Sequence, residues 1–144
     1  MPSEDPEKEV HAKIREICLG NQDAINFLVA FFDWVHWLDD VCDKETGELT
    51  AKSIAEVNLT FLIAVSTNPF WLANSHRLLP IIIQATIAWV DSEKWKTQEG
   101  KNKVAADVLK GYYHEVFWHA AFILGGWEHA LAVTQRHRAY DYEQ

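Results

Sequence analysis

The chain has 144 residues, of which 21 are acidic and 13 basic, so its formal net charge is −8. This charge argues against a nucleic-acid partner, because such binding needs a basic face that displaces counterions from phosphates. No apolar run approaches the roughly 18 residues that a membrane span requires. The polar segment 1–9 is unlike a signal peptide. We therefore expect a cytoplasmic protein with neither a membrane nor a nucleic acid among its partners.

The acidic excess is confined to two segments. Residues 1–9 contain four acidic side chains and one basic one, and residues 33–48 contain six acidic side chains and one basic one. The rest of the chain has equal numbers of both signs. The second segment is therefore the one to examine for a function.

Turn-forming residues are scarce: the chain has only 6 Gly and 4 Pro. Few connections in a chain of this length imply long helices, and short connections imply antiparallel neighbours. We predict an all-α, single-domain helical bundle over residues 1–144. We expect Pro80 to kink the fourth helix and Gly125–Gly126 to bend the last one or to allow close packing. Apolar spacing and turn signals predict the helices at residues 6–19, 23–44, 50–66, 69–96 and 101–136.

The cysteines and tryptophans favour a buried, reduced core with an additional interface. Cys18 and Cys42 fit no metal or redox spacing, which predicts two free buried thiols. We expect Trp to be mostly in the core. Seven Trp residues are still many for one small core, so we also expect a homo-oligomer with aromatic residues at its interface. The five for which we expect core positions are Trp34, Trp37, Trp89, Trp118 and Trp127.

The second predicted helix carries one narrow polar stripe on an otherwise apolar surface. At about 100° per residue, its polar side chains fall within an arc of about 100°. The stripe therefore faces either solvent or an internal cavity. Three explanations stay open: a solvated helix face, a metal site, and a contact with basic residues of a partner helix. The stripe consists of Asn26, Asp33, His36, Asp40 and Asp43.

The composition of this stripe favours the metal site as a hypothesis. Asp33, Asp40 and Asp43 stack along it without any Lys or Arg among them. Like charges at this spacing repel one another unless a cation lies between them. Carboxylates with one imidazole are typical ligands of Mg²⁺ or Mn²⁺. We assign these three aspartates to the metal and His36 to a ligand or proton-carrying role.

The run Asp39–Asp40–Val41–Cys42–Asp43 resembles the aspartate-rich motif of isoprenoid synthases. That motif holds Mg²⁺ and, through it, a diphosphate. The resemblance covers five residues, no second metal motif follows, and the chain is about half the usual size of those enzymes. Asp40 and Asp43 also resemble one acidic motif of the all-α nucleotide pyrophosphatases, whose second Glu-x-x-Asp element is missing here. Both resemblances imply metal-assisted handling of a diphosphate.

Three further residues are candidates to complete a site. Asn58 lies among apolar residues on the expected buried face of the third helix, where an amide needs hydrogen-bond partners or could face the stripe. Arg77 could clamp a phosphate with two hydrogen bonds, or it is an ordinary surface arginine. His114 could serve as a general acid or base, or fill a structural role.

Two functions therefore compete. The first is a divalent-metal-dependent hydrolase or transferase acting on a small molecule that bears a phosphate or diphosphate. There, Asn58 and Arg77 bind substrate while His36 and His114 move protons. The second is a non-enzymatic interaction protein that forms homo-oligomers and docks a partner on the acidic strip. A small-molecule binding protein with an aromatic pocket is a third, weaker hypothesis.

Overall fold

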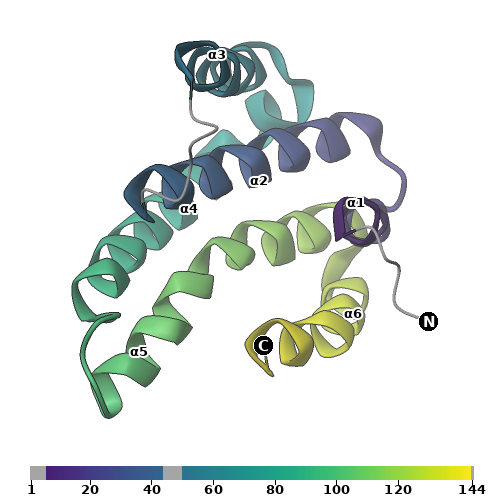
Figure 1. The fold of residues 1–144 in the computed structure, drawn as a ribbon. Helices are drawn as coiled ribbons and strands as arrows, with labels where there is room; N and C mark the ends of the chain where they lie inside the picture. The colour runs from purple at the N-terminus through teal and green to yellow at the C-terminus, as the bar shows by residue number, and fades with distance from the viewer. Residues whose placement is uncertain (1–5, 44–49, 144) are drawn as a thin grey trace. The chain divides into compact units, whose positions relative to one another are not determined.

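The computed structural model describes residues 6–43 and 50–143, with side chains described for residues 8–42 and 50–138. Within this part of the chain the structure is helical and contains no strand, which confirms the predicted all-α fold (Figure 1). None of the described helices combines the length and the hydropathy that a membrane span requires. The elements are α1 (Pro6–Ile17), α2 (Gln22–Asp43), α3 (Ala51–Thr67), α4 (Pro69–Trp95), α5 (Lys101–Lys110), the 3₁₀ turn η1 (Gly111–Tyr113) and α6 (His114–Glu143).

The tertiary contacts divide the chain into two compact units. Unit 1 comprises Met1–Arg15 and Gly20–Asn74, and unit 2 comprises Glu16–Leu19 and Ser75–Gln144. Helix α4 passes from one unit to the other and continues through Pro80. The kink at that proline stays a prediction, as does the single domain.

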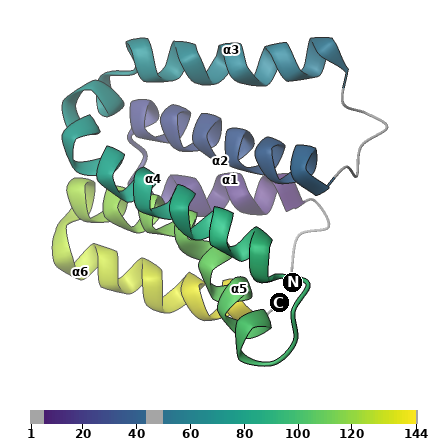
Figure 2. The same cartoon turned by 90° about the vertical axis from the view of Figure 1, so that its left-hand side faces the viewer.

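In unit 1, α3 packs along α2 in the opposite direction (Figure 2). Thr50 begins α3 with a capping box, in which its side chain and that of Ser53 each accept a hydrogen bond from the other's backbone N–H. Asn68 ends α3, and its amide donates to the carbonyl oxygen of Asp23 at 2.9 Å. This bond holds the end of α3 beside the start of α2, so the two helices are antiparallel.

The core of unit 1 is aromatic. Phe27, Leu28 and Phe31 of α2 are almost completely buried. The ring of Phe27 stacks on that of Trp71 with centroids 5.0 Å apart. Burial of such side chains stabilises the fold by roughly 1.5–3 kcal/mol each.

Helix α3 differs from the sequence prediction, because none of its residues is buried. Leu59, Leu62 and Ile63 are more than half exposed, and Asn58, placed by the sequence on a buried face, is only half-buried. The apolar pattern of α3 correctly indicated a helix, but its apolar side chains are not covered by the described parts of the chain.

Unit 2 contains the largest error of the sequence prediction, since residues 101–136 do not form one helix. Helix α5 ends at Gly111, where a 3₁₀ turn intervenes before α6 begins. Gly126 then interrupts α6 with φ 79° and ψ −172°. Only glycine adopts this backbone conformation without strain, so Gly126 marks a reversal rather than a bend.

The two segments of α6 fold back on each other at Gly126 (Figure 2). Glu115 and Arg138 form an ion pair at 3.1 Å, and the Arg138 guanidinium lies 5.9 Å from the Trp118 ring centre. In a straight helix these 23 positions would span about 34 Å. Residues 114–125 and 127–143 therefore form an antiparallel helical hairpin.

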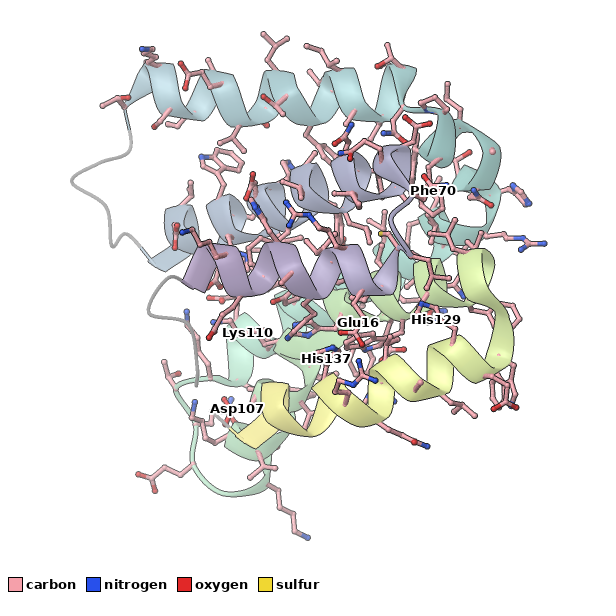
Figure 3. All side chains as sticks on the ribbon, turned by 90° about the vertical axis from the view of Figure 1, so that its right-hand side faces the viewer. Glu16, Phe70, Asp107, Lys110, His129 and His137 are labelled. Atoms are coloured by element: carbon pink, nitrogen blue, oxygen red, sulfur yellow. The ribbon has the colours of Figure 1, made fainter. Side chains whose placement is uncertain are left out.

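Glu16 and Ile17, at the end of α1, bind the second segment of this hairpin. The carboxylate of Glu16 pairs with Arg136 and with His137, the latter at 3.0 Å (Figure 3). His129 donates from Nε2 to the carbonyl oxygen of Ile17 at 2.9 Å. Three side chains of α6 thus hold Glu16–Leu19 in unit 2.

The predictions for individual cysteines and tryptophans were correct in part. Neither cysteine forms a disulfide, but only Cys18 is buried, whereas Cys42 is exposed. Trp118 is buried, and Trp127, placed in the core by the sequence, is 63% exposed. Trp127 follows the reversal at Gly126, which turns it away from the face that the uninterrupted helix would have presented. Trp34, Trp37 and Trp89 are partly buried.

Candidate functional site

The polar stripe of α2 is an exposed face. Asn26, Asp33, His36 and Asp40 are all exposed, while the opposite side of the helix carries the aromatic core. The side chain of Asp43 lies outside the described residues. The described part of the stripe, from Asn26 to Asp40, is therefore solvated rather than enclosed.

One end of this stripe borders a hollow of about 320 Å³ in unit 1. Such a volume lies at the lower end of the range of roughly 300–1,000 Å³ that is typical of small-molecule sites. Helices α1, α2 and α3 all contribute to its wall. The lining residues are His11, Arg15, Ile25, Asn26, Val29, Ala30, Asp33 and Thr60.

Helix α1 supplies the basic residues that the stripe itself lacks. Arg15 and His11 are four residues apart, so they share a face of α1, and both line the hollow together with Asp33. Among the described residues, no hydrogen bond or ion pair engages the Arg15 guanidinium. By contrast, Arg136 and Arg138 of unit 2 are paired with carboxylates.

The amide of Asn26 lies at the edge of the same hollow. Its Oδ1 atom accepts a hydrogen bond from Nε2 of Gln22 at 2.8 Å, which fixes the orientation of the amide. Thr60 is the residue of α3 that lines the hollow. The lining thus combines polar groups from three helices with the apolar side chains of Ile25, Val29 and Ala30.

His36 has a defined hydrogen-bonding state. Its Nδ1 atom lies 3.0 Å from the carbonyl oxygen of Phe32, and its ring lies 3.9 Å from that of Phe32. Because a carbonyl oxygen only accepts, Nδ1 carries the hydrogen of this bond.

The aspartates of α2 do not form a preassembled metal centre within the part of the chain that the structure describes. There, no group of three or more His, Cys, Asp or Glu side chains is close enough to hold a metal ion. Asp33 and Asp40 lie about two helical turns apart on the exposed face of α2.

The remaining predicted site residues lie elsewhere. Asn58 donates from its amide to the carbonyl oxygen of Ile54 at 2.8 Å, one turn earlier on α3. Arg77 belongs to unit 2, where its positive charge acts on His119. Burial first, and Arg77 second, lower the pKa of His119 below its ordinary value.

His114 also belongs to unit 2, where it contacts the 3₁₀ turn and two aromatic rings. Its Nδ1 atom lies 2.9 Å from the carbonyl oxygen of Gly111, which closes the 3₁₀ turn. Its ring lies 4.0 Å from that of Tyr113 and 6.2 Å from that of Trp118. These contacts position the start of α6.

The sequence reasoning missed His11, Arg15 and Thr60. The first two have a detectable signal, because they are spaced i, i+4 at the edge of the apolar face that contains Ile14 and Cys18. Thr60 has no such signal. Only the antiparallel packing of α3 on α2 brings it to the hollow.

No protein-family model matches the sequence, and no curated protein or solved structure is significantly similar to it.

Proposed function

We propose that the protein binds a small phosphate-bearing molecule in the hollow of unit 1, together with a divalent cation. The observation that carries this proposal is the Arg15 guanidinium, which lines the hollow beside His11 and has no hydrogen bond or ion pair with the described residues. Guanidinium groups bind phosphate oxygens through paired, charge-assisted hydrogen bonds.

In this proposal, the carboxylate of Asp33 binds the cation. A carboxylate repels a phosphate beside it, whereas a cation between them is attracted by both. Mg²⁺ is commonly held by one or two carboxylates together with phosphate oxygens and water. Asp33 therefore suffices as the protein ligand near the hollow, and Asp40 lies two turns further along the same face.

The proposal assigns the proton-carrying role to His36, since it belongs to the same unit and the same exposed face as Asp33. Its Nδ1–H donates to the carbonyl oxygen of Phe32, which holds the ring on this face of α2. A bound cation would supply polarisation of a phosphoryl oxygen. Hydrolysis or transfer on the phosphate is the reaction class that this arrangement supports.

Thermal denaturation in four conditions tests the proposal: buffer, Mg²⁺ alone, pyrophosphate alone, and both together. We expect an upward shift of several degrees only with both, because a ligand at 100 times its Kd stabilises by about 2.7 kcal/mol. Arg15→Gln and Asp33→Asn should each abolish the shift. Arg77→Gln, an exposed arginine of unit 2, is the matched control and should keep it.

Two results would overturn the proposal. One is an unchanged melting temperature of the wild type in all four conditions, repeated with Mn²⁺. The other is a full shift in Arg15→Gln, which would move the phosphate away from the hollow.

A further inference from the structure

Unit 2 contains another hollow, of about 290 Å³, which has no role in the proposed function. Helix α4, the 3₁₀ turn η1 and the start of α6 contribute to its wall, and every lining residue belongs to unit 2. The volume lies just below the range of roughly 300–1,000 Å³ that is typical of small-molecule sites, so the hollow suits a small ligand. The lining residues are Ile81, Gln84, Ala85, Tyr112 and Glu115.

The facing side chains show that α4 and the first segment of α6 run antiparallel at this hollow. Ile81 and Glu115 line it together. One turn before Ile81, Arg77 lies close enough to His119 for its charge to act on the imidazole, and His119 is one turn after Glu115. Arg77 therefore lies about 6 Å along α4 from Ile81. We call the hollow, together with Arg77, the unit 2 site.

The carboxylate of Glu115 is fixed in position beside the hollow. Its Oε1 atom accepts a hydrogen bond from Nη2 of Arg138 at 3.1 Å, and the Arg138 guanidinium lies 5.9 Å from the Trp118 ring centre. Within the part of the chain that the structure describes, Oε2 of Glu115 accepts no hydrogen bond. This oxygen can accept a charge-assisted hydrogen bond from an ammonium group.

Two neutral polar groups lie in the same hollow. The amide of Gln84 and the hydroxyl of Tyr112 both line it, and neither makes a hydrogen bond with the described residues. A primary ammonium group has three N–H donors. The carboxylate of Glu115, the amide oxygen of Gln84 and the hydroxyl oxygen of Tyr112 offer one acceptor for each of them.

The opposite charge lies at the other end of the unit 2 site. Arg77 is exposed, and its guanidinium makes no hydrogen bond or ion pair with the described residues. A guanidinium binds a carboxylate through two parallel hydrogen bonds. Between Arg77 and Gln84, the apolar Ile81 lies on the same face of α4. Arg77 would repel a purely cationic ligand, whereas it attracts one that also carries a carboxylate.

We propose that the unit 2 site binds a short ω-amino acid, whose ammonium group donates to Glu115 and whose carboxylate pairs with Arg77. Its aliphatic chain would lie on Ile81. Because the two charges of the site are about one helical turn apart, the ligand's charged groups must be separated by several methylene groups. The inference is independent of phosphate binding in the hollow of unit 1.

Isothermal titration calorimetry of the full chain with γ-aminobutyrate and δ-aminovalerate tests the proposal. We expect saturable binding of at least one of them. Butylamine and butyrate each lack one charge and should bind about tenfold or more weakly, because a charge-assisted contact is lost. Free glycine should also bind weakly, since its two charged groups are attached to one carbon atom.

Variants test the two charged contacts separately. Glu115→Gln and Arg77→Gln should each weaken binding about tenfold or more. Glu115→Gln also breaks the ion pair with Arg138, whereas Arg138→Gln breaks this ion pair but keeps the carboxylate and should bind at least as tightly as the wild type. Gln84→Ala disturbs no ion pair and should weaken binding several-fold. The matched control for Arg77→Gln is Lys94→Gln, an exposed basic position of the same helix, which should bind normally.

Three results would overturn the proposal. The first is the absence of saturable binding of either ω-amino acid at millimolar concentration. The second is equally tight binding of butylamine, which would leave Arg77 without a role. The third is binding that Gln84→Ala leaves unchanged while Arg138→Gln weakens it as much as Glu115→Gln does, since Glu115 would then act through the fold alone. Circular dichroism of each variant checks that the helices are retained.

Discussion

The imidazole of His129 donates a hydrogen bond of 2.9 Å from Nε2 to the main-chain carbonyl oxygen of Ile17, 112 residues earlier in the chain. Ile17 is the last residue of α1, so its carbonyl has no donor within the helix. The bond therefore satisfies a helix end and holds Glu16–Leu19 against α6 at the same time. Glu16 adds an ion pair to Arg136 and a hydrogen bond from His137 beside it (Figure 3).

We predict that His129→Ala lowers the free energy of unfolding by about 1–2 kcal/mol, because it leaves a partly buried carbonyl oxygen without a donor. Gly125→Ala should act on the same bond. A methyl group there would lie 2.5 Å from Cδ2 of His129 and displace the ring. Urea denaturation of both single variants and of the double variant measures the effect.

The double variant should cost less than the sum of the single ones, since both changes remove one interaction. Gln135→Ala, at an exposed position of the same helix segment, is the control and should change stability by less than about 0.5 kcal/mol. Strict additivity of the first two variants would show that Gly125 does not act through His129.

A second prediction concerns pH. Burial, and then the positive charge of Arg77, lower the pKa of His119 below 6.5. The unfolded chain therefore binds this proton at a higher pH than the folded chain does. This difference in pKa makes a contribution to the free energy of unfolding that is fully present above about pH 6.5. The contribution is lost as the pH falls through that value towards the lower pKa of His119 in the folded state.

Titration of the His119 ring by NMR measures this shift directly. Arg77→Gln should raise the pKa of His119 towards its ordinary value and weaken the acid dependence of stability. Arg77→Lys keeps the charge and should preserve most of the shift. If the two variants behave alike, the charge of Arg77 is not a cause of the shift.

The third prediction concerns the different reactivities of the two thiols towards an alkylating reagent. Burial raises the pKa of Cys18 to about 12, so its thiolate fraction at pH 8 is roughly 10⁻⁴. Cys42 is exposed. Mass spectrometry after brief alkylation of the native protein should find one label per chain, on Cys42. Cys42→Ser should take up label only in denaturant, and rapid native labelling of Cys18 would contradict its burial.

The sequence predicts the helices well where their apolar stripes and caps are local. Thr50, Asn68–Pro69 and Gly20 mark boundaries that the structure places within about two residues. The reversal at Gly126 was predicted only as a bend. A Gly–Gly pair is compatible with several backbone paths, and the path is chosen by distant contacts such as that between Glu115 and Arg138.

The sequence predicted only part of the candidate site. The stripe of α2 follows from the periodicity of one helix, so Asp33 and Asn26 were identified from spacing alone. The hollow needs Arg15 and Thr60 from two other helices, and spacing within one helix contains no information about its neighbours. For the same reason, the sequence could not show that Arg77 and His114 belong to unit 2.

The last prediction concerns the attachment of α3, which has no buried residue. The ring of Trp34 on α2 stacks on that of Phe61 on α3, with centroids 4.5 Å apart and planes at 7°. Because no other residue of α3 is buried to compensate, Trp34→Ala should lower stability by about 1–2 kcal/mol and speed amide hydrogen exchange along α3 more than along the rest of α2. Leu59→Ala, on the exposed side of α3 at 58% exposure, is the control and should leave exchange nearly unchanged. Uniform acceleration across unit 1 would instead mean that α2 and α3 open together, with the ring stack as part of one cooperative core.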